Sequence, residues 1–393
     1  MRFEDALDAP GLGAIAEIKR RSPSLGEIRP DADSGRIAAA YEKAGAAAVS
    51  VLVDERFGGS WDDLRAARAS SRLPLLAKGF FSTEEHLRTA KEAGADAALL
   101  LLRDLDDDAV RLLLGIAAEL ELDTLVEAHD AAELNRAIAL GARVIGVNAR
   151  DLSTFEIDRG AQLDLVAQSH KASPRPVVVA ESGIHTRAQG AAAELAGADA
   201  ILVGSALMQA PDPAEKLAEL LRRPLVKVCG LTREEDVTAA AEAGADLAGF
   251  ILAKESPRQA ESVLDVPDTL LAVAVWVGET GESPASLDQL YGRTGAHRSR
   301  DAVLLRDGEQ VGSVVDLPWK KDDPLHFTRA AAVEGRVMLA GGLDATNVQN
   351  AIQAVRPWAV DASSRLEVEP GIKDHEKVRA YVEAARSESR GAA

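Results

Sequence analysis

Short apolar runs alternate along this chain with longer stretches rich in Ala, Leu, Glu and Arg. Runs of four to eight apolar residues are typical of buried strands, whereas the longer stretches have the length and composition of surface helices. Over about the first 220 residues the pattern repeats eight times, the number of strand–helix units in a (β/α)8 barrel. The expected strands are AIAEIK (14–19), AVSVLV (48–53), LPLLAK (73–78), AALLLL (97–102), DTLVE (123–127), RVIGVN (143–148), PVVVAE (176–181) and AILVG (200–204).

Five of the expected helices end in the same way, with a glycine followed by alanine directly before a strand. The five glycines are Gly45, Gly94, Gly141, Gly197 and Gly244. Without a Cβ, glycine easily adopts the left-handed conformation that often follows a helix. Helix, glycine and buried strand in a repeated order indicate an all-parallel α/β chain, which places its active site at the carboxyl ends of the strands.

After residue 224 the pattern starts again but is less regular. We expect seven strands there: LVKVC (225–229), DLAGFIL (246–252), LLAVAVWV (270–277), DAVLLR (301–306), GSVVDL (312–317), RVMLAGG (336–342) and WAVDAS (358–363). The predicted fold class is therefore α/β, with two (β/α)8 TIM-type barrels in tandem, the second shortened or incomplete. A boundary near Arg222–Pro224 gives domains 1–223 and 224–393. A smaller α/β fold of another kind is the alternative for the second domain.

Composition narrows the class of protein. A net charge of −18 argues against nucleic-acid and anionic-membrane partners, because both would be repelled. The single cysteine, Cys229, excludes an intramolecular disulfide and fits a reducing compartment. No segment resembles a secretory signal or reaches the roughly 20 apolar residues of a membrane span, so we expect a soluble, cytoplasmic protein. The histidines and the cysteine form no ligand-spaced cluster, so no metal is expected.

Charged and amide side chains follow several of the first-barrel strands, where a polar residue costs burial energy unless it faces the site. They are Glu17, Lys19, Lys78, Glu127, Asn148 and Glu181. Because two lysines and three carboxylates at one barrel mouth shift each other's pKa values, we expect general acid–base chemistry. Solvated strand ends are the alternative explanation for any single one of them.

Glycine and serine after the last two strands of the first barrel indicate a phosphate site. Ser182-Gly183 follows strand seven, and Gly204-Ser205 precedes a short helix after strand eight. Backbone N–H groups at glycine turns and helix N-termini bind anions, and these two loops are the usual phosphate site of a barrel. Ser22, after strand one, could add a hydroxyl.

The first-barrel motifs resemble those of indole-3-glycerol-phosphate synthases. The motifs are IAEIKRRSPSLG (15–26), LLAKGFF (75–81), TLVEAHD (124–130), IGVNARDLSTFEID (145–158), VAESGI (179–184) and ILVGSALM (201–208). The resemblance implies closure of a phosphorylated anthranilate-substituted deoxyribulose to an indole, with loss of carbon dioxide and water. It makes Lys78 the general acid, Glu127 the acid or base for dehydration, and Lys19 the partner of the substrate carboxylate. It assigns substrate orientation to Glu17, Phe80, Asn148, Arg150, Glu181 and Ser182, and phosphate binding to Ser22, Gly183, Gly204 and Ser205.

Two features depart from the synthase pattern. The family normally has aspartate after the catalytic lysine, and here the residue is Gly79. Only about thirteen residues precede strand one, whereas the family carries several dozen, including a helix over the active site. We therefore expect weaker support for the lysine cations, and either a lower substrate affinity or a lid supplied by another segment.

The second half resembles phosphoribosylanthranilate isomerase, which makes the synthase's substrate by a sugar rearrangement. The motifs are VKVCGLT (226–232), GFILAKESPR (249–258), LAGGLDATN (339–347) and VDASSRLEVEPGIKD (360–374). The resemblance makes Cys229, with a lowered thiol pKa, the general base and Asp316 the general acid. It assigns the anthranilate carboxylate to Arg258 and the phosphate to Gly341, Gly342, Ser363 and Ser364. A small buried apolar residue is the alternative for Cys229.

This half departs further from its family. No counterpart of the Gln-Leu-His-Gly element is found, and LLRDGE (304–309) is expected in its place; PWKKDDP (318–324) replaces a glycine-rich loop, and Arg365 replaces a glycine. The predicted function is thus a bifunctional synthase and isomerase of tryptophan biosynthesis. It is expected to be a monomer without a cofactor, acting on small phosphorylated anthranilate-sugar substrates. A synthase with a degenerate second domain and a non-catalytic phosphate-ligand binding protein are the alternatives.

Overall fold

The computed structural model describes residues 2–22, 25–150, 156–294, 297–317 and 323–387. They form two compact units. The first contains residues 1–185 and 190–221, and the second contains residues 186–189 and 222–393.

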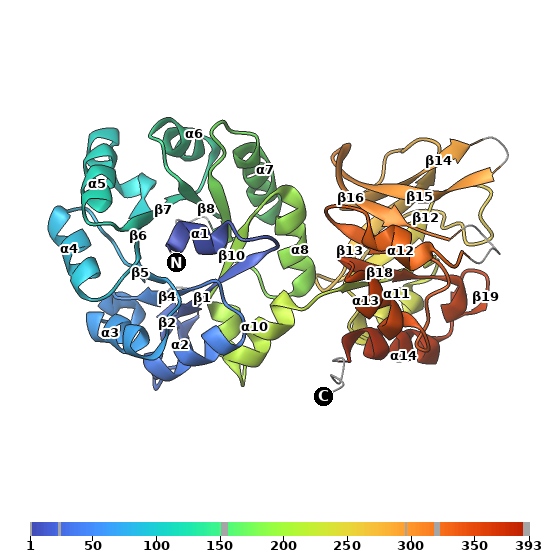
Figure 1. The fold of residues 1–393 in the computed structure, drawn as a ribbon, viewed down its shortest axis with the longest axis horizontal. Helices are drawn as coiled ribbons and strands as arrows, with labels where there is room; N and C mark the ends of the chain where they lie inside the picture. Colours follow the sequence, from blue (N-terminus) through green and yellow to red (C-terminus); the bar gives the residue numbers. More distant parts are fainter. Residues whose placement is uncertain (1, 23–24, 151–155, 295–296, 318–322, 388–393) are drawn as a thin grey trace. The chain divides into compact units, whose positions relative to one another are not determined.

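The first unit is a closed barrel of eight parallel strands in the order β1-β10-β9-β8-β7-β6-β5-β4 (Figure 1). The strands are β1 (Gly13–Ile18), β4 (Ala48–Leu52), β5 (Leu75–Lys78), β6 (Ala97–Leu101), β7 (Asp123–Ala128), β8 (Val144–Asn148), β9 (Val177–Glu181) and β10 (Ala200–Val203). Around them lie α2 (Ser34–Lys43), α3 (Trp61–Ser70), α4 (Glu84–Glu92), α5 (Asp107–Glu119), α6 (Ala131–Ala139), α7 (Arg159–His170), α8 (Arg187–Ala196), α9 (Ser205–Gln209) and α10 (Pro213–Leu221). The eight strands predicted for this half are confirmed.

The glycines predicted to end helices have the backbone that the pattern requires. Gly45, Gly94, Gly141, Gly197 and Gly244 all have φ between 77° and 109°. The next helix often begins at a side-chain cap; for example, the carboxylate of Asp130 accepts a hydrogen bond from the backbone N–H of Glu133 at the start of α6. Glycine at one end of a connection and a capping residue at the other fix where each unit of the barrel begins and ends.

A short helix, α1 (Phe3–Leu7), closes the end of the first barrel where the strands begin (Figure 1). Phe3 and Leu7 are fully buried in an apolar cluster with strand residues such as Leu76 and Leu125. Glu4 ties the helix to the strand starts, because its backbone N–H donates to Asp123 at 3.1 Å. The opposite end, where the strands finish, carries the charged side chains.

The second unit is also a closed barrel, with strand order β11 to β18. The strands are β11 (Leu225–Cys229), β12 (Leu247–Ile251), β13 (Leu271–Val277), β14 (Leu287–Thr294), β15 (His297–Arg306), β16 (Glu309–Val315), β17 (Val337–Leu339) and β18 (Ala359–Ala362). Its helices are α11 (Glu234–Glu242), α12 (His326–Ala331), α13 (Val348–Val355) and α14 (His375–Arg386). The hairpin β19 (Glu367–Glu369) and β20 (Ile372–Lys373) follows β18.

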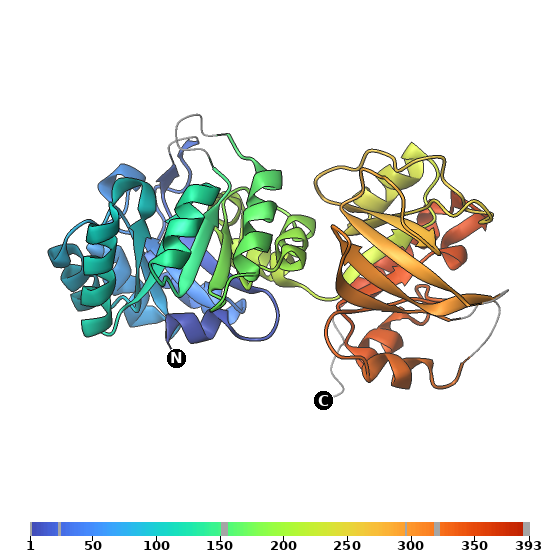
Figure 2. The ribbon, with the colours of Figure 1, turned by 90° about the horizontal axis from the view of Figure 1, so that it is seen from above.

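The prediction of seven strands, and hence of an incomplete barrel, is wrong. The missed strand is β14. It pairs antiparallel with β15, and β15 pairs antiparallel with β16, so no helix of the described residues separates these three strands (Figure 2). The β15–β16 turn is Asp307-Gly308, with φ of 52° and 77°, as in the type I′ turns of tight hairpins. Because hairpins replace helical crossovers, eight strands close within a shorter chain segment.

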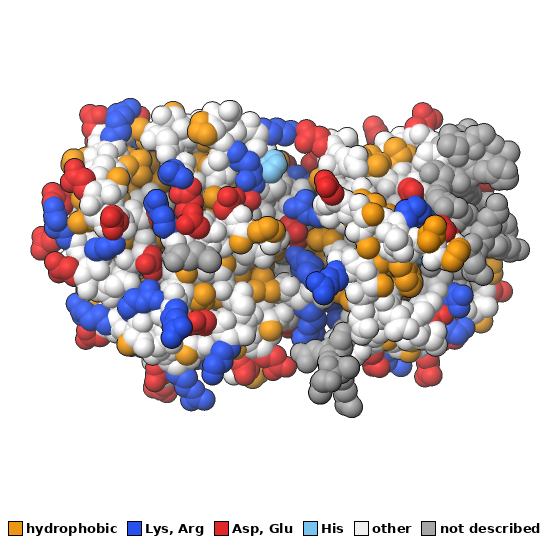
Figure 3. Space-filling view, viewed as in Figure 1, with side chains coloured by type: hydrophobic (Ala, Val, Ile, Leu, Met, Phe, Trp, Pro, Cys, Tyr) orange, Lys and Arg blue, Asp and Glu red, His pale blue; other side chains and the backbone are white. Residues whose placement is uncertain are grey.

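No helix in the described parts of the chain is long and apolar enough to cross a membrane. Acidic and basic side chains are interspersed over the face of the first unit drawn in Figure 3. Among the residues with a described placement, no group of three or more His, Cys, Asp or Glu could hold a metal ion.

Candidate active sites at the carboxyl ends of the strands

Lys78, at the end of β5, is the centre of the charge cluster in the first barrel. Its Nζ lies 2.8 Å from Glu181 Oε2, 3.3 Å from Glu17 Oε2 and 3.9 Å from Glu127 Oε2. These carboxylates come from β9, β1 and β7, and all three are almost completely buried. The strand ends therefore bring four of the predicted residues into one polar cluster.

Lys19 and Asn148 extend this cluster on either side. Lys19 Nζ lies 2.9 Å from Glu17 Oε1, and Asn148 Nδ2 donates to Glu127 Oε1 at 3.0 Å. The backbone N–H of Arg150 in turn donates to Asn148 Oδ1 at 3.0 Å. All six predicted acid–base residues are thus connected by direct contacts.

His129 is a member of the cluster that the sequence analysis missed. Its Nε2 lies 3.1 Å from Glu127 Oε1, and its Nδ1 lies 3.0 Å from Glu133 Oε2. Burial lowers the pKa of His129, but the two carboxylates outweigh it and raise the pKa to about 8. His129 follows Glu127 by two residues, so the strand alternation could have predicted that they share a face.

The cluster separates its carboxyl groups into different protonation states. Burial opposes ionisation of Glu127, but His129 and Lys78 outweigh it and lower its pKa to about 2. Glu181 behaves oppositely, because burial together with the negative charge of Glu127 raises its pKa to about 8 despite Lys78. The pKa of Lys78 is raised, since the three carboxylates outweigh burial. At neutral pH the site therefore contains a cationic Lys78, an ionised Glu127 and a protonated Glu181.

Two glycines leave room for these carboxyl groups. A Cβ on Gly146 would lie 2.0 Å from Glu181 Oε1, and a Cβ on Gly204 would lie 2.3 Å from Glu17 Oε1 and 2.9 Å from Lys19 Nζ. Gly204, predicted as a phosphate ligand, thus also makes space for the acid–base cluster.

The predicted phosphate loops contain left-handed residues and the start of a helix. Ser182 and Gly183 are both left-handed, with φ of 68° and 69°, and Gly204-Ser205 begins α9. The hydroxyl of Ser22 accepts a hydrogen bond from the backbone N–H of Leu25 at 3.1 Å. Pro23 and Ser24, its neighbours in the motif, lie outside the described residues.

Gly79 and Phe80 lie in an aromatic region beside the cluster. A Cβ on Gly79 would lie 2.9 Å from Phe81 Cε1, so an aspartate there would need Phe81 to move. Phe80 is 39% exposed, and the guanidinium of Arg56 lies 3.8 Å from the centre of its ring. Phe80 contacts Arg56 and Phe57.

In the second barrel, Lys227 on β11 is the centre of a buried polar group. Its Nζ donates to Gln289 Oε1 at 2.6 Å and to Asp361 Oδ2 at 3.0 Å. Cys229, two residues further, lies beside this lysine; burial raises its pKa to about 11, although Lys227 opposes the shift. This is opposite in direction to the lowered thiol pKa expected for a general base.

Asp316, the predicted general acid, directly follows β16. Its Oδ2 accepts from the hydroxyl of Tyr291 at 2.8 Å, and its Oδ1 accepts from the backbone N–H of Leu317 at 2.7 Å. Burial raises its pKa to about 6, so a proton is retained well above the usual range of an aspartic acid. Most of the loop that follows, residues 318–322 of the predicted replacement segment, lies outside the described residues.

The expectation that LLRDGE (304–309) stands in place of the Gln-Leu-His-Gly element is wrong. Gln289-Leu290-Tyr291-Gly292 lies on β14, the fourth strand of the barrel, and differs from that element only by tyrosine for histidine. LLRDGE instead forms the β15–β16 hairpin. The element was missed together with its strand.

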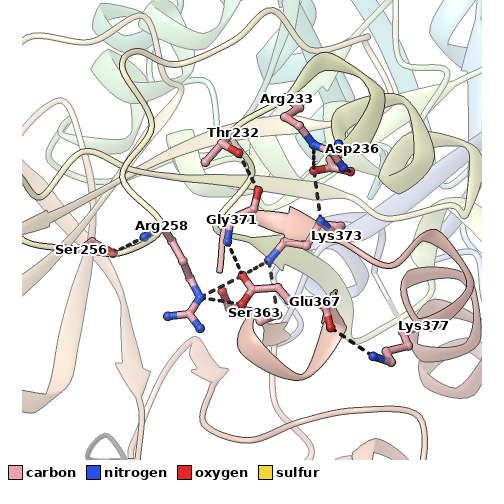
Figure 4. A network of polar contacts seen from close by, with 10 residues as sticks. All are labelled: Thr232, Arg233, Asp236, Ser256, Arg258, Ser363, Glu367, Gly371, Lys373 and Lys377. Atoms are coloured by element: carbon pink, nitrogen blue, oxygen red, sulfur yellow. Dashed lines mark hydrogen bonds and ion pairs between the residues drawn. The ribbon is translucent and has the colours of Figure 1, made fainter. Parts of the chain in front are cut away.

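Arg258 faces a buried ion-pair network beyond the end of β18 (Figure 4). Its Nε donates to both carboxyl oxygens of Glu367 at 2.9 Å, and Lys373 Nζ donates to the same carboxylate at 2.8 Å. Lys373 also donates to the backbone carbonyl of Ser363 at 3.3 Å. Glu367 therefore fixes the Arg258 side chain through Nε, and the two terminal nitrogens point away from the network (Figure 4).

Gly342, one of the predicted phosphate residues of this barrel, lies beside Arg365. Gly341 and Gly342 are left-handed, with φ of 99° and 66°. A Cβ on Gly342 would lie 3.6 Å from Arg365 Nε, and Arg365 forms an ion pair with Asp344 at 3.0 Å. Ser363 Oγ is buried without a partner among the described residues, and Ser364 begins the next helical turn. The arginine that replaces the family's glycine thus adds a cation beside the glycine loop.

Comparison with known proteins relates the two halves of the chain to two enzyme families. A family model described as indole-3-glycerol phosphate synthase matches residues 1–220, and one described as N-(5'phosphoribosyl)anthranilate isomerase matches residues 282–384. The tryptophan biosynthesis protein TrpCF of Salmonella typhi is 36% identical, over 95% of this chain and 88% of that protein. The indole-3-glycerol phosphate synthase of Mycobacterium ulcerans is 44% identical, over 55% of this chain and 79% of that protein.

A multifunctional tryptophan biosynthesis protein of Phycomyces blakesleeanus is 32% identical over 95% of this chain, which spans 62% of that protein's length. Two closed barrels with charged strand ends define an α/β-barrel protein with two candidate active sites. The chain belongs to the indole-3-glycerol phosphate synthase family, as a fused protein of tryptophan biosynthesis whose second domain is of the phosphoribosylanthranilate isomerase type.

Proposed function

We propose that residues 1–223 convert 1-(2-carboxyphenylamino)-1-deoxyribulose 5-phosphate to indole-3-glycerol phosphate. The observation that supports this most strongly is Lys78 Nζ within 3.9 Å of three carboxyl groups from three different strands. Lys78 protonates the substrate ketone oxygen as the ring carbon attacks and the new carbon–carbon bond forms. Carbon dioxide then leaves the ring, and the hydroxyl formed from the ketone takes a second proton from Lys78 and leaves as water.

The remaining residues of the cluster divide the proton transfers and the binding. Glu127, ionised because of its low pKa, accepts the proton released during dehydration. Glu181, protonated at neutral pH, resupplies Lys78 at 2.8 Å. Lys19 binds the substrate carboxylate, and Asn148 orients Glu127. The loops at Ser22, Gly183, Gly204 and Ser205 bind the phosphate.

We propose that residues 224–393 isomerise N-(5-phosphoribosyl)anthranilate to the substrate of the first barrel. Asp316 donates its proton to the ribose ring oxygen as the bond from that oxygen to C1 breaks, and Cys229 removes the proton from C2, the carbon next to C1. The resulting enaminol then tautomerises to the ketone. The buried cations Lys227 and Lys373 favour the thiolate that this step needs, since both oppose the effect of burial on Cys229.

A paired assay tests both proposals. Each substrate is supplied separately to the purified protein, and indole-3-glycerol phosphate is followed. Lys78→Ala should abolish product from both substrates, whereas Cys229→Ser should abolish product from phosphoribosylanthranilate alone. Lys43→Ala, an exposed lysine at the end of α2, is the matched control and should leave both rates unchanged.

The outcomes separate the alternative functions. Product from the deoxyribulose phosphate alone would mean that the second barrel is not an isomerase. Product from neither substrate would leave a phosphate-ligand binding protein and would refute the enzyme proposal.

A further inference from the structure

Tyr291 joins the general acid of the second barrel to its neighbours. Its hydroxyl donates to Asp316 Oδ2 at 2.8 Å and accepts from Gln289 Nε2 at 2.9 Å. Tyr291 and Gln289 are two residues apart on β14, so both side chains point to the same face of the sheet. The hydroxyl therefore uses its donor on the acid and an acceptor position on the amide.

The side-chain amide of Gln289 also hydrogen-bonds to a residue of β11. Gln289 Oε1 accepts from Lys227 Nζ at 2.6 Å, and this lysine lies beside Cys229. A Cβ on Gly249 would lie 2.7 Å from Cys229 Sγ and 2.8 Å from Lys227 Cε, which shows how closely the thiol and the lysine stem lie. A continuous row of side chains thus runs from β11 through β14 to the end of β16.

We propose that Tyr291 is a positioning residue for the isomerase reaction, which fixes the carboxyl of Asp316 and links it through Gln289 to the lysine beside Cys229. The inference rests on the proposed isomerase function and adds a residue to it. Tyr291 stands where the family's Gln-Leu-His-Gly element has histidine. Among the described residues, this hydroxyl is the only side chain that hydrogen-bonds to the Asp316 carboxyl. Its loss therefore leaves that carboxyl with a hydrogen bond from one backbone N–H.

The Tyr291 hydroxyl also affects how Asp316 titrates. The charged or titratable groups that face Asp316 are Tyr291 from β14, Asp361 from β18, Lys227 from β11, and Arg329 from α12, which reaches the backbone carbonyl of Asp316. Burial and Asp361 raise the carboxyl pKa, whereas the Tyr291 hydrogen bond and Lys227 lower it. Removing the hydroxyl must therefore raise the pKa of Asp316 further above about 6.

Tyr291→Phe tests this inference in the full chain. A hydrogen bond to a carboxylate corresponds to a pKa shift of about one unit, so the Asp316 pKa should rise by about that amount. The shift is measured by carboxyl carbon-13 NMR of protein labelled at aspartate, with Asp316→Asn identifying the signal. Isomerase kcat should fall about tenfold with KM within about twofold of the parent, because the acid and not the binding groups is disturbed. Tyr291→His should restore most of kcat.

Tyr381→Phe is the matched control, because Tyr381 is fully buried in the same barrel and its hydroxyl has no hydrogen-bond partner among the described residues. It should change neither kcat nor the Asp316 titration. Synthase turnover should be the same in all these variants, which reports an intact chain.

The proposed isomerase function and the role of Tyr291 can be refuted separately. Absence of isomerase turnover in the parent protein would overturn the proposed function and this inference with it. Isomerase turnover that Tyr291→Phe leaves unchanged, with an unchanged Asp316 pKa, would overturn this inference alone.

Discussion

Adding one methyl group at Gly146 tests whether the position of Glu181 matters to the synthase. Gly146 lies on β8, and an ideal Cβ there would be 2.0 Å from Glu181 Oε1. An ordinary contact begins at 3.4 Å, so the carboxyl group must move by about 1.4 Å (3.4 − 2.0). The same carboxyl accepts a hydrogen bond from Lys78 at 2.8 Å, and a displacement of this size breaks that bond.

The expected effect follows from the strength of that contact. A hydrogen bond in which one partner is charged, here the Lys78 ammonium, contributes about 1.5–3 kcal/mol, so Gly146→Ala should lower synthase kcat about 10- to 100-fold. Overpacking of the barrel interior should in addition cost about 1–3 kcal/mol of stability.

The assay is steady-state synthase turnover with the deoxyribulose phosphate supplied directly. Gly115→Ala is the matched control, because Gly115 is exposed in α5 and an added Cβ there meets nothing within 4 Å. The control should keep full turnover and gain about 0.5–1 kcal/mol of stability from better helix propensity. Full kcat in a folded Gly146→Ala protein would refute the reasoning, because Glu181 would then not be needed where the structure has it.

Three further substitutions have definite expected outcomes. The pKa of His129 is raised from 6.5 to about 8, so its stabilising effect is complete below pH 6.5 and is lost as pH rises through 8. His129→Gln should therefore cost about 1–2 kcal/mol in urea unfolding at pH 6 and much less at pH 9; equal losses would contradict this. Gly308→Ala should destabilise the second unit by about 1 kcal/mol, because φ is 77°, and an unchanged melting midpoint would argue against the left-handed turn. Gly79→Asp should cost about 1–3 kcal/mol in calorimetry, since Phe81 occupies the space, and a variant as stable as the parent would show that Phe81 moves freely.

The first barrel could be predicted from the sequence because its strands are apolar throughout. A strand with one face in the barrel interior and the other under the helices is buried on both faces, so its sequence is a continuous apolar run. AALLLL (97–102) is such a run and can be recognised from the sequence alone. In contrast, β14 reads Leu-Asp-Gln-Leu-Tyr-Gly-Arg-Thr and contains few apolar residues. Its side chains Gln289 and Tyr291 are polar and hydrogen-bond to Lys227 and Asp316. The strand was missed because these polar side chains leave it without an apolar run.

The candidate site in the first barrel could also be predicted only in part. The convergence of Glu17, Lys78 and Glu181 follows from topology alone, because parallel strands bring their carboxyl ends to one edge. The opposite protonation states of Glu127 and Glu181 could not be predicted, because they depend on which carboxyl lies next to His129. The contacts of each carboxyl group determine those states, and a sequence pattern does not contain them.

The hairpin-linked strands also bear on the order in which the second barrel assembles. Pairing β15 with β16 joins Arg306 to Glu309 across a two-residue turn, whereas closing the barrel joins Leu225 to Ala359, 134 positions apart (359 − 225). By the logarithmic dependence of loop closure on length, the closing contact costs about 3 kcal/mol more chain entropy. The three-stranded segment β14–β16 is thus able to form locally, whereas the β11–β18 pairing carries the larger cost of chain closure.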